Sequence, residues 1–179
     1  MSRPPDAGRH RLVVLCNTSD HTLWTAATLI KSGAHVVGIA AAGERTGLDR
    51  IRVLLKRNDP LRFLSKSLAS RLYGAVNGQR DRQYYASHYR REEIDATIRA
   101  AGVPLRTCSR FGDPEVIEWV RSLAPDILVV HAATIVPRRM REIPSTGLVI
   151  GGHPGLTHLF RGGYSSFRAL YQGRHPDIG

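Results

Sequence analysis

The chain has 179 residues, a formal net charge of +11 and two cysteines. Its length suits one domain with a hydrophobic core, and 42% hydrophobic and 23% charged residues are ordinary for a globular protein. Two cysteines cannot form a disulfide framework or a four-ligand metal site, and no apolar run reaches the roughly 18 residues of a membrane span. The composition therefore predicts a reduced, cytoplasmic protein without a metal or membrane partner, with a disordered polar lead-in at residues 1–10.

Most of the positive charge lies in one segment. Residues 47–91 contain eleven Lys and Arg against three Asp, which places +8 of the +11 there. Such a segment suits a phosphate-bearing ligand, an anionic membrane surface or a nucleic acid. Its aromatic residues do not follow the spacing of a known base-stacking module. We interpret the segment as a solvated basic face, with a polyanion-binding surface as the alternative.

The first elements alternate between strand and helix. Residues 11–16 form a continuous apolar run, which is typical of a buried parallel strand. The N-cap residues at 17–20 then open a helix that ends at Gly33. Residues 34–40 form the next apolar run. Together these elements predict a βαβ unit with a right-handed crossover.

The basic segment is predicted to be mainly helical. Residues 49–78 have helical character, and Pro60 suits the first turn of the second of two helices. Leu61, Leu64, Leu68 and Leu72 recur at helical spacing and form an apolar stripe, which we expect to pack on the sheet. The polar residues 79–90 are predicted to form a loop.

The second half of the chain continues the alternation. We predict helices at 91–101, 113–124, 137–143 and 165–172, and strands at 103–107, 126–130 and 147–150. The apolar runs 127–130 and 148–150 are predicted to be central strands, buried on both faces. The fold class is therefore α/β, a Rossmann-like three-layer sandwich with a mostly parallel sheet. One domain is expected over residues 11–179, with a basic helical insertion at about 47–91.

The first strand ends in Asn17-Thr18-Ser19. This is where a doubly wound sheet binds anions, because helix N–H groups and small hydroxyls meet at the carboxyl end of the strand. No G-x-G-x-x-G sequence is present, so a dinucleotide site has little support. A simple helix cap remains the alternative.

The stretch from Asp126 to Gly173 carries the most specific pattern. A buried strand, a proline-started helix and a second strand are followed by Gly-Gly-His-Pro-Gly-Leu-Thr at 151–157 and Phe-Arg-Gly-Gly at 160–163. This order resembles the folate-dependent formyltransferases, a family that acts on glycinamide ribonucleotide, methionyl-tRNA and sugar amines. The residues of these motifs are more similar to those of the branch that acts on sugars or other small amines. The first βαβ unit agrees with the family in architecture only.

The resemblance implies roles for individual positions. His153 corresponds to the catalytic histidine that assists attack of an amine on the formyl carbon of 10-formyltetrahydrofolate, the implied co-substrate. An imidazole suits this role because its pKa lies near working pH. The loop that holds the pterin ring corresponds to Ala132, Ala133, Thr134, Ile135 and Val136. The substrate side corresponds to Asn17, Thr18 and Ser19, which meet a phosphate of the amine substrate, and to Arg161 and Gly162, which close over it.

Two departures from the family pattern stand out. Gly151 occupies the position of an asparagine that donates a hydrogen bond to the developing oxyanion. Loss of one such donor costs roughly 10²–10³ in rate in other enzymes. The sequence also ends at Gly179, before the family's catalytic aspartate loop. We therefore expect a C-terminally truncated chain with impaired formyl transfer to a small phosphorylated or nucleotide-sugar amine, and leave open whether it is an enzyme.

Three alternatives stay open at this stage. A non-catalytic protein could bind folate or a phosphorylated ligand through the same degenerate site. A relative of methionyl-tRNA formyltransferase would suit the net charge, although that enzyme carries a separate RNA-binding barrel. Basic helices on a Rossmann-like domain could also bind nucleic acid, in which case binding would depend steeply on salt.

Overall fold

The structure, a computed structural model, describes residues 9–43, 60–132, 135–152 and 172–173. Its strands are β1 (Leu12–Asn17), β2 (Val36–Ala42), β3 (Leu105–Cys108), β4 (Ile127–His131) and β5 (Leu148–Gly151). Its helices are α1 (Asp20–Lys31), α3 (Pro60–His88), α4 (Arg91–Ala100), α5 (Pro114–Ser122) and α6 (Arg138–Arg141). The predicted helix at 165–172 lies almost wholly outside the described residues.

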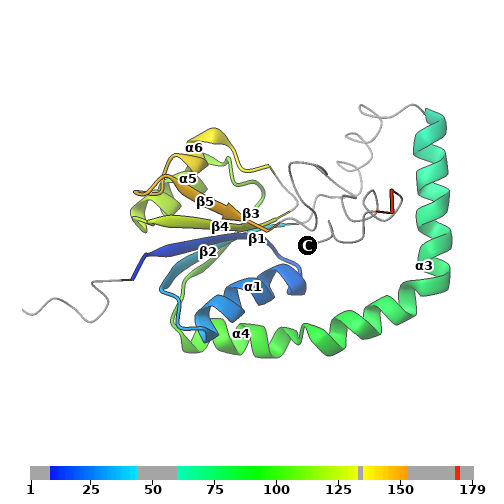
Figure 1. Cartoon of the computed structure of the whole chain (residues 1–179), viewed down its shortest axis with the longest axis horizontal. Coiled ribbons are helices and arrows are strands. Elements are labelled where there is room, and N and C mark those ends of the chain that lie inside the picture. The colour runs from blue at the N-terminus through cyan, green and yellow to red at the C-terminus, as the bar shows by residue number, and fades with distance from the viewer. Residues whose placement is uncertain (1–8, 44–59, 133–134, 153–171, 174–179) are drawn as a thin grey trace, which may run out of the picture. The chain divides into compact units, whose positions relative to one another are not determined.

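The strands form one sheet in the order β3-β2-β1-β4-β5. Strand β1 pairs in parallel with both β2 and β4, and β2 pairs in parallel with β3. Helices α1 and α4 lie on one face of this sheet, and α5 and α6 on the other (Figure 1). The predicted Rossmann-like α/β fold is confirmed.

Alternating side chains of β1 build the two cores. Val13 and Leu15 point toward α5 and α6, whereas Val14 and Cys16 point toward α1 and α4. All four side chains are fully buried, as expected for a central parallel strand covered on both faces. Burial also raises the pKa of the Cys16 thiol to about 12, so this cysteine is a neutral core residue.

Helix caps follow the sequence signals. Gly33 and Gly102 follow α1 and α4 with φ of +80° and +63°, the left-handed conformation that glycine adopts without steric cost. Asp113 precedes α5, and Pro114 stands in its first turn. The predicted ends of these helices are confirmed to within a few residues.

Three expectations from the sequence were wrong. Residues 79–88 belong to α3 instead of a loop. Strand β5 is the edge of the sheet, with Leu148 and Ile150 each about half exposed, so it is not a central strand. In the predicted stripe, Leu64, Leu68 and Leu72 are exposed, at 63%, 61% and 60%, so these side chains do not pack on the sheet.

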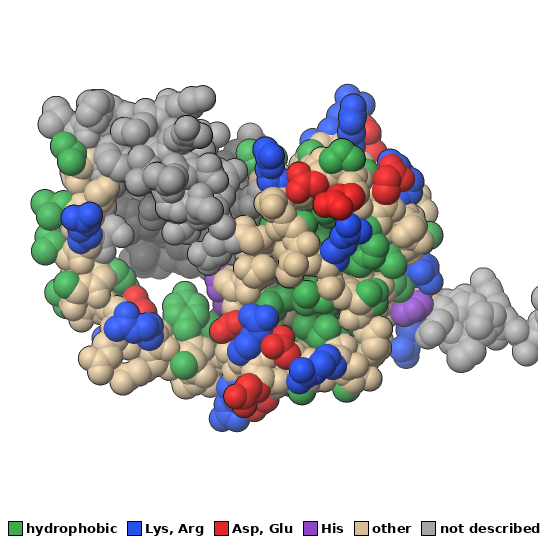
Figure 2. Space-filling view, turned by 180° about the vertical axis from the view of Figure 1, so that it is seen from behind, with side chains coloured by type: hydrophobic (Ala, Val, Ile, Leu, Met, Phe, Trp, Pro, Cys, Tyr) green, Lys and Arg blue, Asp and Glu red, His purple; other side chains and the backbone are tan. Residues whose placement is uncertain are grey.

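The cations of the described part of α3 are solvated as predicted. Arg71, Arg80 and Arg82 are exposed. Figure 2 shows hydrophobic side chains exposed along α3 on its left side, and Lys and Arg interspersed with Asp and Glu around α4 at the lower centre. No helix in the described ranges combines the length and the apolar character that crossing a membrane requires.

Candidate functional site

The strand order places the topological switch point of the sheet between β1 and β4. From β1 the chain moves outward through β2 to β3, and then returns to the other side of β1 to form β4. Loops after β1 and β4 therefore run to opposite faces of the sheet, and in open α/β sheets this arrangement gives a crevice at the carboxyl ends of the two strands. Ligands of open α/β sheets bind at this switch point. Asn17 and His131 are the last residues of the two strands.

The turn after β1 is fixed to the neighbouring strand. The backbone N–H of Thr18 donates to the carbonyl of Ala42 at 3.1 Å, and the Asn17 side-chain amide lies 3.4 Å from the same oxygen. The N-cap residue Ser19 has extended backbone angles, φ −73° and ψ 147°. The turn is thus held in place before α1 begins.

The hydroxyls of this turn bond to each other and to the backbone. Ser19 Oγ lies 3.0 Å from Thr22 Oγ1, and the buried Thr22 hydroxyl lies 2.8 Å from the Asn17 carbonyl oxygen. Ser19 makes no side-chain cap hydrogen bond to α1. The backbone N–H groups of Thr22 and Leu23 donate to the Ser19 carbonyl, each at 3.1 Å, so the hydrogen bonds of α1 begin at its N-cap residue.

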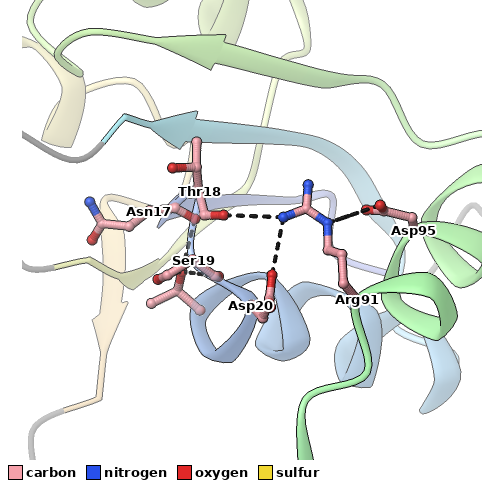
Figure 3. A network of polar contacts seen from close by, with 7 residues as sticks. Asn17, Thr18, Ser19, Asp20, Arg91 and Asp95 are labelled. Atoms are coloured by element: carbon pink, nitrogen blue, oxygen red, sulfur yellow. Dashed lines mark hydrogen bonds and ion pairs between the residues drawn. The ribbon is translucent and has the colours of Figure 1, made fainter. Parts of the chain in front are cut away.

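Arg91, the first residue of α4, joins this turn from a distant part of the sequence (Figure 3). Its Nη1 donates to the Thr18 carbonyl at 3.3 Å and to Asp20 Oδ1 at 3.1 Å. Its Nε donates to Asp95 at 2.9 Å. Asp20 suits the first turn of α1, yet its charge would repel an incoming anion. The Arg91 cation offsets that charge.

A histidine stands at the other side of the crevice. His131 pairs in register with Cys16, and its Nδ1 lies 2.6 Å from the Thr25 hydroxyl of α1. Partial burial lowers the pKa of His131 below its ordinary value, and the nearby charge of His21 lowers it further. The imidazole is therefore neutral at physiological pH, a state in which one nitrogen accepts a hydrogen bond.

The loop after β4 exposes only some of its apolar side chains to solvent. Ile135 is 83% exposed, whereas Val136 is buried in the core beneath α5 and α6. Ala132 packs against that core, and Ala133 and Thr134 lie outside the described residues. Among the three described members of the predicted pterin loop, Ile135 is exposed, Ala132 is half-buried and Val136 is buried.

His153, Arg161 and Gly162 lie outside the described residues. Gly151 is the last residue of β5 and is exposed. Across the described ranges, no three His, Cys, Asp or Glu side chains gather closely enough to hold a metal ion.

The sequence comparisons found partial matches to formyltransferases. No protein-family model matches the chain. A methionyl-tRNA formyltransferase of Chloroflexus aggregans is 42% identical over 64 residues, 35% of this chain and 20% of that protein. One of Moorella thermoacetica is 35% identical over 81 residues, 45% of this chain and 26% of that protein.

Solved structures agree at the level of the fold. A glycinamide ribonucleotide transformylase of Symbiobacterium toebii superposes with a TM-score of 0.52 at 15% identity, covering 92% of this chain and 61% of that one. A phosphoribosylglycinamide formyltransferase of Anaplasma phagocytophilum gives 0.51 at 15% identity, covering 92% and 59%. The chain has the formyltransferase fold. It spans about three fifths of those solved formyltransferases, and each sequence match spans about a fifth to a quarter of the relative.

Two residues of the crevice in this formyltransferase fold were missed from the sequence alone. A polar residue at the carboxyl end of a central strand is the signal that could have found His131. Arg91 carried no such signal, because 73 residues separate it from Thr18 and only the packing of α4 beside α1 brings them together.

Proposed function

We propose that this protein binds 10-formyltetrahydrofolate and a primary amine at the crevice between β1 and β4, as a member of the formyltransferase family. The observation that carries the proposal is sequence identity of 42% to a methionyl-tRNA formyltransferase in a chain that has the formyltransferase fold. The turn at Asn17 and the exposed Ile135 after β4 stand at the carboxyl end of the sheet, where such a ligand is expected.

The proposed chemistry is transfer of one formyl group. The amine attacks the formyl carbon, the bond from that carbon to N10 of the folate breaks, and N10 takes a proton as tetrahydrofolate leaves. In this proposal the imidazole of His153 accepts the proton that the attacking nitrogen loses. The turn at residues 17–19 holds an anionic group of the amine substrate, with Arg91 balancing the charge of Asp20.

Two classes of acceptor are supported by different observations. The residues of the motif at 151–163 favour an amine on a small phosphorylated or nucleotide-sugar compound as the acceptor. The curated relatives are methionyl-tRNA formyltransferases, and the basic segment at 47–91 would suit an RNA acceptor. We propose the small anionic amine as the acceptor and methionyl-tRNA as the second candidate.

Gly151 is the residue that we expect to limit the rate of formyl transfer. A glycine has no side-chain donor for the oxyanion that develops during attack, so we expect formyl transfer to be slow or absent and the protein to act mainly in binding. The Gly151→Asn variant restores a side-chain amide at the end of β5. If the oxyanion donor is what limits turnover, this variant raises the rate by roughly 10²–10³.

The experiment measures formyl transfer from 10-formyltetrahydrofolate by the full chain and by Gly151→Asn, with a sugar-phosphate amine or methionyl-tRNA as acceptor. We expect turnover by the variant with the small amine, lost when His153→Ala is added. Turnover with methionyl-tRNA alone would replace the first acceptor by the second. A Gly151→Asn variant that binds folate yet gains no rate would show that the protein is a binder and not a transferase.

A further inference from the structure

Two histidines meet beside the crevice. The ring centroids of His21 on α1 and His131 on β4 are 5.8 Å apart, and the ring planes are inclined at 77°. Both side chains are half-buried. The Thr25 hydroxyl, one turn after His21, lies 2.6 Å from His131 Nδ1. The two imidazoles are thus held edge to face by short-range packing and one hydrogen bond.

The end of α3 packs on the same histidine. The His21 ring lies 6.0 Å from the ring of Tyr85 and 6.2 Å from that of Tyr89, the residue that follows α3. Tyr89 also meets the edge of Trp24 at 5.8 Å and stacks on Tyr85 at 5.7 Å. A continuous set of ring contacts therefore runs from β4 through α1 to the end of α3.

The charged and titratable groups around the pair come from every neighbouring element. They include Asp20 on α1, Cys16 on β1, Tyr85 on α3 and Tyr89 after it, and Arg91 and Asp95 on α4. The two carboxylates are already paired with Arg91, and the Cys16 thiol is neutral because burial raises its pKa to about 12.

We propose that His21 and His131 form a proton-sensitive link, through which acidification loosens the end of α3 from α1 beside the crevice. Two neutral rings pack edge to face at little cost. Two imidazolium ions at the same separation repel each other, more strongly in a half-buried site than in water. Moving Tyr85 and Tyr89 away lets His21 swing outward and relieves that repulsion.

The direction of the effect follows from the environment of His131. Burial and the neighbouring His21 lower its pKa, so its neutral form persists to more acidic pH than an ordinary histidine. The link is therefore closed at neutral pH and opens as the pH falls below the ordinary pKa of a histidine. An opposing attraction exists, because a protonated His21 could gain cation–π contact with the two tyrosine rings. The experiment distinguishes the two directions.

The test is an NMR titration of the full chain between pH 8 and pH 5. It follows the ring signals of the histidines together with the indole N–H of Trp24 and the ring protons of Tyr89. We expect the Trp24 and Tyr89 signals to shift with the midpoint of His131 and to lose their contacts with α1. The variants His21→Gln and His131→Gln should remove this transition. The control His10→Gln should keep it, because His10 precedes β1 at the amino end of that strand.

Three results would overturn the proposal. The first is titration of His131 in the wild-type chain with Trp24 and Tyr89 signals unchanged. The second is the same transition in both glutamine variants. The third is tighter contact of Tyr85 and Tyr89 with His21 at acid pH, which would mean that cation–π attraction outweighs repulsion. Because the wild-type titration alone gives the first and third results, a variant that fails to fold leaves the test intact. None of these measurements requires formyl transfer, so the proposed function can fail independently.

Discussion

Single residues in this fold are constrained by close approach as much as by burial. Gly38 lies in the middle of β2, where an added Cβ would collide with Leu123 and come within 3.3 Å of the Trp119 ring. The sequence showed an apolar strand with one glycine in it, but not the side chains at the end of α5 and just after it that cover the glycine. Contact between an element and its partner is not encoded in the period of either one.

We predict that Gly38→Ala lowers the free energy of unfolding by about 1–3 kcal/mol, because Leu123 and Trp119 must move to admit the methyl group. Gly74→Ala is the matched control, since Gly74 lies within α3 with no atom near the position of its Cβ. That control should stabilise the chain by roughly 0.5–1 kcal/mol. Chemical denaturation measures both. A Gly38→Ala chain as stable as wild type would contradict the packing described for β2 and α5.

Asp126 is a second constrained residue. It precedes β4, at the amino ends of the strands and therefore opposite the crevice. Its carboxylate accepts hydrogen bonds from the Ser145 hydroxyl at 2.6 Å and from the Arg11 backbone N–H at 2.7 Å. These bonds, the Ser145 bond first, lower the pKa of Asp126 below its ordinary value. They tie the start of β4 to the start of β1 and to the turn before β5.

A lowered carboxylate pKa gives a definite sign to the pH dependence. The stabilisation from Asp126 is complete above its ordinary pKa near 4 and is lost as pH falls through the lower folded value. We predict that Asp126→Asn is less stable than wild type at pH 7 and loses less stability between pH 5 and pH 2. Thermal unfolding across that range, with Glu92→Gln as the control, checks the prediction. Parallel pH curves for wild type and Asp126→Asn would contradict it.

At the scale of elements, α3 shows where sequence patterns were informative and where they were not. Residues 79–88 were predicted to be a loop because they are polar, yet Gln, Arg and Ala favour helix and an exposed helix needs no apolar face. The stripe at residues 61–72 was recognised as helical, but its period says nothing about which surface covers it. For the same reason β5 was predicted to be a central strand, although an apolar run is equally compatible with an edge strand.

The exposed stripe leads to a prediction about stability. Leu68→Gln should change the free energy of unfolding by no more than about 0.5 kcal/mol, because the side chain is 61% exposed. Leu128→Ala, at a fully buried position of β4, should cost about 2–5 kcal/mol. Denaturant unfolding of both variants compares them directly. A loss of more than 1 kcal/mol in Leu68→Gln would show that another surface covers the stripe.

At the scale of the whole molecule, alternation of strand and helix was enough to predict the Rossmann-like fold. The crevice could be placed only approximately, because the position of β4 beside β1 depends on crossovers that the sequence does not specify. Asn17 to Ser19 and Ile135 were anticipated there, whereas His131 and Arg91 became evident from the strand register and from the packing of α4. The predicted role of His153 stays a prediction.

Equilibrium binding of 10-formyltetrahydrofolate to the full chain tests the central claim most directly. We predict saturable binding of one molecule per chain. Ile135→Asp should weaken it at least about tenfold, because a carboxylate replaces the exposed apolar contact offered by the loop after β4. Val76→Asp, an equally exposed apolar position on α3, should leave the affinity unchanged. Absence of saturable binding to the wild-type chain, or equal loss in both variants, would contradict the claim that this formyltransferase fold holds a folate site.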